Sequence, residues 1–266
     1  MKLLFLFISA CLLPGPAICS WENTVTAYKP GPFLKTLRPV HLSFEINWDG
    51  KINSGTLNFL IGRKDKRYPD YHIVQIYGNS TGLARGLYPY DYSFTSFLKK
   101  TDFQTAMLTA VEKDRNELRE TSNWYRSTTT SREVTTPHRK GKTPGTKKTT
   151  FVFKNGPVHD LASALLYVRS LTLKVGQETV MVLHPFASPY LARIKVLGRE
   201  VHRGLKCLKM DLRLQKIGRS GTLLHYDKMT TTTMWLSDDH ERLPVELRSE
   251  VFIGDIRAIL VGKKYL

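Results

Sequence analysis

The sequence is poor in cysteine. It has three Cys among 266 residues, and two of them, Cys11 and Cys19, fall in an apolar leading segment. Cys207 therefore has no partner for an internal disulfide, so covalent bridges are excluded as the source of stability. Apolar and basic residues alternate around Cys207, which favours a cysteine packed inside a strand over a reactive thiol.

Long apolar runs are also absent after the first twenty residues. A membrane-spanning helix needs about 20 consecutive apolar residues, so no transmembrane span is expected. Residues 1–20 have the pattern of a signal peptide: Lys2, an apolar core over Leu3–Leu13, and small residues before a cleavage site between Cys19 and Trp21. We therefore expect an exported, periplasmic protein.

A second interpretation of the leading segment remains open. The run Ile8-Ser9-Ala10-Cys11 resembles the lipobox of bacterial lipoproteins, in which the cysteine is acylated. If Cys11 carries a lipid anchor, the protein is a membrane-anchored lipoprotein rather than a free periplasmic one.

Acidic residues are scarce relative to basic ones. The chain has 40 Lys and Arg against 23 Asp and Glu, a formal net charge of +17. Such a surface favours anionic partners, here the lipid, lipoprotein or polysaccharide of a cell envelope. Nucleic acid is not an expected partner, because the most basic stretch lacks the interleaved aromatic residues on which bases stack.

Helical patterns are rare, and one is clear. In Asp160–Leu171 the residues Leu161, Ala164, Leu165 and Val168 recur at i, i+3, i+4 and i+7, which makes one apolar stripe. Asp160 is suited to cap the first turn. We predict a plug helix that buries this stripe against a curved sheet.

Most of the remaining chain has the period-two alternation of strands. Val40–Trp48 is the clearest example, and Asp49-Gly50 after it is a hairpin turn signal. We predict a mainly β fold after an irregular lead-in over 21–39: a single curled antiparallel meander of about a dozen strands, forming a barrel or spiral over 40–266. A second short helix is favoured within Leu83–Lys99, and Ser127–Thr150 is expected to be a basic exposed loop.

Several separate stretches together resemble a known family. They are Phe44–Trp48, the helix over Asp160–Leu171, Val196–Glu200, Trp235–Asp239 with Leu243-Pro244-Val245, and the hairpin at Gly254. Their order resembles that of exported bacterial β-proteins classed only as a domain of unknown function. The resemblance covers Val40 to Leu260. It implies a periplasmic β-barrel or β-spiral and supplies no catalytic residue and no cofactor.

Two groups of residues are candidates for ligand binding. Aromatic side chains and an arginine near the predicted helices are suited to an apolar pocket at the barrel mouth, although ordinary core packing is the alternative. These residues are Tyr88, Tyr90, Tyr167, Arg169 and Trp235. Cations of the basic segment could contact an anionic surface, with a merely solvated loop as the alternative. These residues are Arg132, Arg139, Lys140, Lys142, Lys147 and Lys148.

Two motifs carry possible chemistry. Gly78-Asn79-Ser80-Thr81-Gly82 matches the G-x-S-x-G pattern of serine hydrolases, with His184, His202 or His225 as the base. That enzyme class needs strands alternating with helices, which this sequence lacks, so a plain turn is favoured. Ser237–Arg242 gathers acidic residues and a histidine, but neighbouring side chains on a turn diverge, so we expect a charged turn and no metal site.

These patterns together favour a non-enzymatic protein of the cell envelope. We expect it to bind an apolar or anionic envelope component without a cofactor. A serine hydrolase that uses Ser80 remains the alternative hypothesis.

Overall fold

The computed structural model describes residues 20–226, 231–251 and 254–266. Residues 1–19 of the predicted signal segment, with Cys11 and Cys19, lie outside the described residues. Two short 3-10 helices, η1 (Trp21–Thr24) and η2 (Pro32–Thr36), begin the described chain. None of the helices within these ranges is long and apolar enough to cross a bilayer.

The first half of the chain is a series of antiparallel strands. Each strand pairs with the next one along the chain, and α1 (Gly82–Leu87) lies between the third and fourth strands. The strands are β1 (Val40–Trp48), β2 (Ile52–Arg63), β3 (Tyr71–Ser80), β4 (Asp91–Lys99), β5 (Thr105–Lys113), β6 (Glu117–Ser127), β7 (Thr130–Arg139) and β8 (Lys147–Val152). The predicted turn between β1 and β2 is confirmed, because Asp49 and Gly50 have φ of 50° and 66° there.

The second half begins with β9 (Val158–His159) and the plug helix α2 (Leu161–Ser170). The strands that follow are β10 (Glu178–Phe186), β11 (Ser188–His202), β12 (Leu205–Ile217), β13 (Leu223–Leu224), β14 (Thr231–Ser237), β15 (Pro244–Val251) and β16 (Gly254–Tyr265). Strands β9 and β10, on either side of α2, are parallel, which the predicted antiparallel meander did not include.

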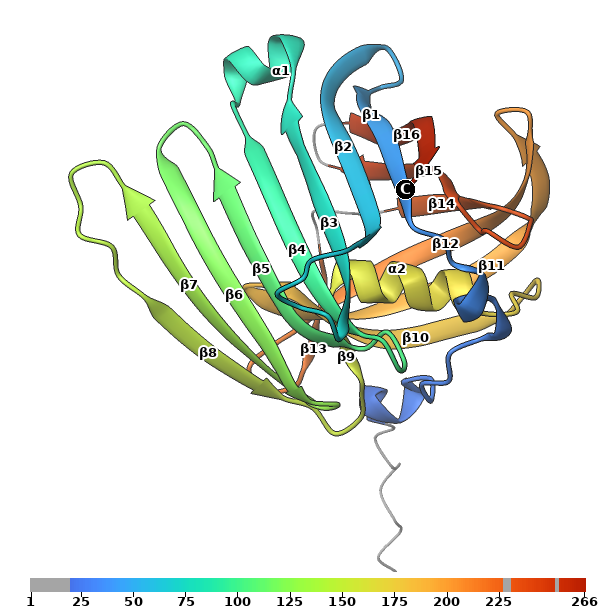
Figure 1. The fold of residues 1–266 in the computed structure, drawn as a ribbon, viewed down its shortest axis with the longest axis horizontal. Coiled ribbons are helices and arrows are strands. Elements are labelled where there is room, and N and C mark those ends of the chain that lie inside the picture. Colours follow the sequence, from blue (N-terminus) through green and yellow to red (C-terminus); the bar gives the residue numbers. More distant parts are fainter. Residues whose placement is uncertain (1–19, 227–230, 252–253) are drawn as a thin grey trace, which may run out of the picture.

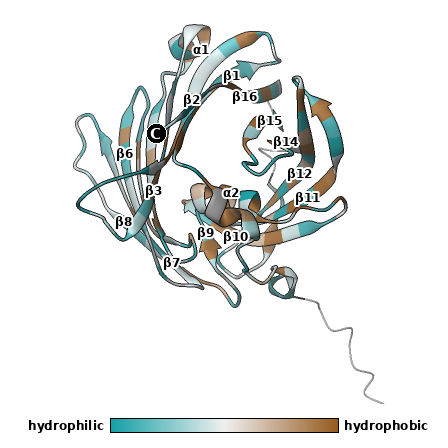
Figure 2. Cartoon of the chain, turned by 45° about the vertical axis from the view of Figure 1, so that its right-hand side comes forward, coloured by the Kyte–Doolittle hydropathy of each residue, from teal (hydrophilic) through white to brown (hydrophobic). Residues whose placement is uncertain are grey.

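All sixteen strands belong to one sheet, whose first and last strands meet at its centre. The order is β8-β7-β6-β5-β4-β3-β2-β1-β16-β15-β14-β12-β11-β10-β9, with β13 beside β12. The sheet curls around α2, as Figures 1 and 2 show, and its ends β8 and β9 do not pair. The predicted mainly β, curled fold with one plug helix is confirmed, with sixteen strands in place of a dozen.

Side chains join the two ends of the curled sheet. The carbonyl of His184 on β10 accepts hydrogen bonds from Tyr125 Oη at 2.6 Å and Asn123 Nδ2 at 2.9 Å, both on β6. Ser131 Oγ on β7 lies 2.7 Å from His184 Nδ1. All four residues are buried. A buried polar cluster thus holds β10 against β6 and β7 where no strand ladder connects them.

The prediction of an exposed loop over Ser127–Thr150 is wrong for most of that segment, which forms β7 and β8. Its strands show no apolar alternation because the buried face of β7 carries polar residues: Ser131 is fully buried and Glu133 nearly so. A strand whose inward residues are polar lacks the period-two alternation of apolar and polar residues, so this pattern does not predict it.

The prediction of a short helix within Leu83–Lys99 is confirmed only in its first part. Helix α1 ends at Leu87, and Asp91–Lys99 is β4. Phe94 and Ser96 are buried and alternate with the less buried Ser93 and Thr95 along β4, which is the period of a strand.

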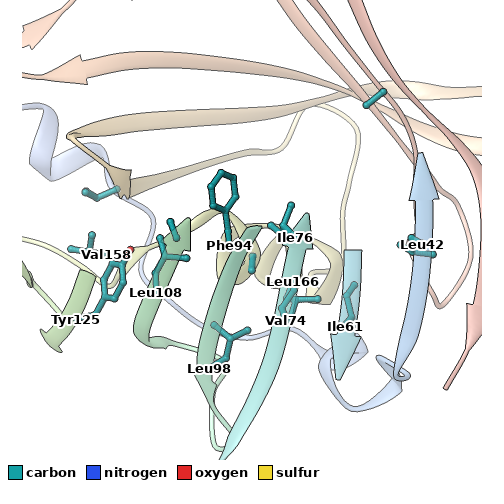
Figure 3. Close-up of a cluster of buried hydrophobic side chains, with 14 of the residues drawn as sticks. Leu42, Ile61, Val74, Ile76, Phe94, Leu98, Leu108, Tyr125, Val158 and Leu166 are labelled. Carbon is teal, nitrogen blue, oxygen red and sulfur yellow. The ribbon is translucent and has the colours of Figure 1, made fainter. Parts of the chain in front are cut away.

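Helix α2 crosses the interior of the curled sheet. Its first turn is closed by a capping box, in which Asp160 Oδ1 accepts from Ser163 N at 2.7 Å while Asp160 N donates to Ser163 Oγ at 3.1 Å. On one face of the helix, Leu166 packs into a buried cluster with inward side chains of the sheet such as Val74 and Leu98 (Figure 3). This packing fixes the helix against the sheet and leaves its other face for the site.

Candidate functional site

An apolar cavity of about 310 Å³ lies between α2 and the inner face of the sheet. The wall formed by α2 is the stripe predicted from the sequence, Leu161, Ala164, Leu165 and Val168. We expected these residues to pack fully against the sheet. However, Leu161 is 42% exposed and Leu165 only partly buried. The stripe therefore faces the sheet across the cavity.

The sheet contributes the rest of the lining, again with apolar side chains. Both arms of the sheet take part: Phe44, Leu57, Phe59, Ile76, Tyr92 and Phe94 on β1 to β4, and Met181, Leu183, Ile194, Leu212, Met234, Pro244, Leu247 and Ala258 on β10 to β16. Met181 and Met234, on two different strands, give an adaptable surface, since Met fills irregular space easily. The cavity can hold an apolar group without a polar partner.

Tyr92 brings a hydroxyl group to this lining, and that hydroxyl is already bonded. Its Oη donates to the backbone oxygen of Thr56 at 3.1 Å. Burial raises the pKa of Tyr92 to about 12, so the phenol stays neutral at physiological pH. The ring stacks on Phe94 with centroids 5.3 Å apart. Tyr92 therefore offers the cavity its ring face rather than a charge.

The structure does not bring together the five residues predicted to bind a ligand. Tyr88 is 62% exposed beyond α1, and Tyr90 donates from its hydroxyl to Glu112. Tyr167 lies on α2 but packs against Tyr28 in a tilted ring pair, with centroids 4.6 Å apart, and does not line the apolar cavity. None of these three lines the cavity.

Arg169 and Trp235 lie elsewhere again. Arg169 is buried and donates through Nη2 to the backbone oxygen of Glu241 at 2.9 Å, which ties α2 to the turn after β14. Trp235 stacks on His202 with centroids 4.1 Å apart, and its indole donates to Glu200 at 2.7 Å. Its neighbour Met234 lines the cavity, so Trp235 must point to the opposite face of β14.

Sequence reasoning missed most of the true lining. Candidates were chosen by residue type and nearness to predicted helices, whereas the cavity follows the inward register of the strands. The signal was present: Phe44 alternates with polar neighbours on β1, and Leu57 and Phe59 do the same on β2. Reading inward positions strand by strand would have selected these residues.

Ser80 is the last residue of β3, and α1 follows after Thr81, so the strand–turn–helix order of the motif is present. However, Ser80 Oγ accepts a hydrogen bond from the backbone of Tyr90 at 2.9 Å. His184, one of the proposed bases, is buried on β10, where its Nδ1 lies 2.7 Å from Ser131 Oγ. His202 bonds to Glu246 instead. The arrangement supports a turn rather than a nucleophile.

The predicted basic residues lie on the hairpin of β7 and β8. Arg139 is paired with Glu117, Nε to Oε2 at 2.5 Å, and Arg132 faces Trp124 in the strand register. Lys140, Lys142, Lys147 and Lys148 are exposed at and beside the hairpin end. None of these cations lines the apolar cavity.

The acidic turn after β14 has a local explanation. Asp239 Oδ1 accepts from the backbone of Glu241 at 2.9 Å, from that of Arg242 at 3.0 Å and from Ser237 Oγ at 2.8 Å, as in an Asx turn. Over the described ranges, no three His, Cys, Asp or Glu side chains gather as they would to hold a metal ion.

Fold and cavity together define a class: an open, barrel-like β protein that encloses a helix and an apolar internal cavity. Within that class, the chain belongs to the family of proteins of unknown function DUF3108, whose profile matches residues 43–261. The resemblance to a β family classed as a domain of unknown function is thus confirmed. No curated protein matches the sequence.

A solved structure has a similar fold. It is the crystal structure of a beta-barrel-like protein of domain of unknown function DUF1849 from Brucella abortus, with 8% sequence identity and a TM-score of 0.50. The similarity covers 86% of this chain and 98% of that one. At this identity the likeness concerns the fold alone.

Proposed function

We propose that this protein is a non-enzymatic component of the cell envelope that holds an apolar molecule, the acyl chain of a lipid or lipoprotein, in the apolar cavity. One observation carries the proposal: the apolar stripe of α2 stays partly exposed inside the sheet, facing an apolar wall across about 310 Å³. Removing such surfaces from water is favourable, so an apolar ligand complements them.

The lining supports one of the ligand classes expected from the sequence over the others. A polysaccharide needs hydrogen-bond donors and acceptors aimed at its hydroxyl groups, and the one hydroxyl in the lining, that of Tyr92, is already bonded to Thr56. An acyl chain needs only contact with carbon atoms. The volume lies at the lower end of the range for small-molecule sites, about 300–1,000 Å³, so part of one chain would fill it.

The proposed cellular location rests on the leading segment. Residues 1–20 have the charge, apolar core and small residues of an export signal. A protein exported to the periplasm meets lipids and lipoproteins that leave the inner membrane, and their acyl chains must be kept from water. One role, keeping an acyl chain from water in the periplasm, therefore accounts for both the predicted signal segment and the apolar cavity.

The direct test is a titration with N-phenyl-1-naphthylamine, a neutral apolar dye that fluoresces when it leaves water. We expect saturable binding by the wild-type protein. The variant Leu165→Glu places a carboxylate in the cavity and should weaken dye binding by roughly tenfold or more, because burying an unpaired charge is costly. A matched control is Leu197→Glu, since Leu197 is 47% exposed and does not line the cavity.

Two results would contradict the proposal. One is equal dye binding by the Leu165→Glu and wild-type proteins. The other is mass spectrometry of protein purified from its envelope without detergent in which no acyl-bearing molecule is retained. Circular dichroism of both variants distinguishes a loss of binding from a loss of fold.

A further inference from the structure

A second cavity, of about 350 Å³, lies on the other side of α2. We call it the basic pocket. Leu166 of α2 lines it, and in a helix this residue points away from the stripe formed by Leu161, Leu165 and Val168. Helix α2 thus contributes to two cavities, with its stripe to the apolar cavity and with Leu166, on another face, to the basic pocket.

The floor of the basic pocket is apolar. Ile61 and Val74 are buried inward side chains of β2 and β3, and Leu166 is 1% exposed. Phe103, between β4 and β5, completes the floor and is partly buried. These four side chains offer hydrocarbon contact to any molecule that enters.

The rim of the pocket is strongly positive. Five exposed cations line it: Arg38, Arg63, Lys64, Lys66 and Lys100. Within the part of the chain that the structure describes, no salt bridge joins any of the five to a carboxylate.

One carboxylate, that of Asp65, also lines the pocket, but another residue occupies it. Arg67 Nη2 lies 2.8 Å from Asp65 Oδ2, and Arg67 is not among the lining residues. The excess positive charge at the rim is therefore not neutralised locally, which is the condition under which an anion binds from solution.

His72 also lines the basic pocket, close to the positive charge of Lys100. Its ring stacks on Phe103 with centroids 4.6 Å apart. Burial and the nearby charge of Lys100 lower the pKa of His72, so the imidazole is kept neutral. An anion bound at the rim would offset the charge of Lys100 and raise that pKa, which gives the site a spectroscopic signature.

We propose that the basic pocket binds the head of an anionic amphiphile, with a phosphate group among the rim cations and the first carbons of its alkyl chain on the floor. An anionic amphiphile matches both the rim and the floor of the pocket, whereas the other ligand classes match only one of them. A free phosphate leaves the apolar floor unused, and a neutral lipid leaves five cations unpaired. This site is separate from the apolar cavity and does not depend on that cavity being a ligand site.

The test uses the full chain and three probes below their micelle-forming concentrations: dodecyl phosphate, dodecyl maltoside and inorganic phosphate. Isothermal titration calorimetry should give a Kd for dodecyl phosphate at least about tenfold lower than for either other probe, because only it satisfies both rim and floor. Its affinity should fall as salt is raised. Equal affinity for dodecyl maltoside, or for inorganic phosphate, would overturn the proposal.

A pair of triple variants locates the binding. Lys64→Gln with Lys66→Gln and Lys100→Gln removes three rim charges and should weaken dodecyl phosphate binding by about tenfold or more. Lys140→Gln with Lys142→Gln and Lys147→Gln removes the same charge from the β7–β8 hairpin and should leave the Kd within about twofold. An equal loss in both variants would mean a general charge effect and defeat the assignment.

The Leu165→Glu variant separates this proposal from the previous one. Dodecyl phosphate binding and the accompanying shift of the His72 imidazole signals in NMR should persist in that variant, even where naphthylamine binding is lost. If dodecyl phosphate binding disappears with Leu165→Glu and survives the rim variant, the amphiphile occupies the apolar cavity and the basic pocket is not its site.

Discussion

His184 shows how a single buried residue links the ends of the sheet. It is fully buried, and its backbone and ring together meet Asn123, Tyr125 and Ser131. Burial lowers its pKa to about 4, although the carboxylate of Glu133 lies 3.7 Å from Nε2. Desolvation of the charged ring thus outweighs that attraction, and the folded protein holds His184 neutral at pH 7.

This predicts an acid sensitivity with a definite sign. Since the folded pKa of about 4 lies below the ordinary histidine pKa of 6.5, the unfolded chain binds the proton more readily. Stability should be full above pH 6.5 and should be lost as pH falls from 6.5 towards 4, by about 1–3 kcal/mol from this residue. Urea unfolding at pH 7 and pH 4.5 measures the loss, and His184→Gln should reduce the difference between the two pH values.

The matched control is His138→Gln. His138 is partly exposed beside Glu120, with Nε2 to Oε2 at 2.9 Å, so its replacement should leave the pH dependence close to that of the wild type. If His184→Gln shows the same pH dependence as the wild type, the neutral buried histidine is not the source of the acid sensitivity.

At the scale of one element, α2 depends on its first turn. The capping box joins Asp160 and Ser163, and Ser163 Oγ also accepts from Thr105 Oγ1 on β5 at 2.8 Å. The cap therefore orients the helix relative to the sheet as well as satisfying its free amides. Because α2 forms a wall of both cavities, its orientation sets the shape of each.

Replacing the cap should destabilise the protein. We expect Asp160→Ala to lower the free energy of unfolding by about 1–2 kcal/mol, since the amide of Ser163 loses its acceptor. Asp160→Asn keeps an acceptor oxygen and should cost less. Urea unfolding of the three proteins at pH 7 gives the order, and an Asp160→Asn protein less stable than Asp160→Ala would show that the cap is not the source.

The same elements explain what the sequence could and could not predict. Period two revealed strands such as β1 and β3, where one face is apolar. The apolar stripe predicted helix α2, but not that the stripe stays partly exposed. Strand β7 was missed because its buried residues include Ser131 and Glu133, and β9 because two residues carry no period. Most of the lining of the apolar cavity was missed for another reason: which residues face the cavity depends on the register of distant strands, as at Met234 and Trp235.

For the whole molecule, the order of the strands makes the lead-in part of the fold. The sheet is continuous through β1 and β16. Strands β8 and β9 follow one another in the sequence, but they form the two edges of the sheet and do not pair with each other. The segment before β1 contacts the part of the sheet formed by β10 to β16: Thr26 N donates to the carbonyl of Val180 on β10 at 2.8 Å. Trp21 Nε1 donates to the carbonyl of Gly221 at 2.6 Å. The chain from Trp21 onward is therefore structural.

This constrains where a signal peptidase can cut, and so predicts the mature protein. Cleavage between Cys19 and Trp21 keeps Trp21 and its contact with Gly221, whereas a cut beyond Thr26 would remove the contact with Val180 as well. In a bacterial host, intact-mass measurement of the periplasmic fraction should give a chain that begins at Ser20 or Trp21. A chain that begins at Cys11 with the added mass of acyl groups would establish the lipoprotein alternative, and it too keeps the contacts of Trp21. Full-length protein confined to the cytoplasm would contradict export, and with it the proposal that the apolar cavity serves lipids of the envelope.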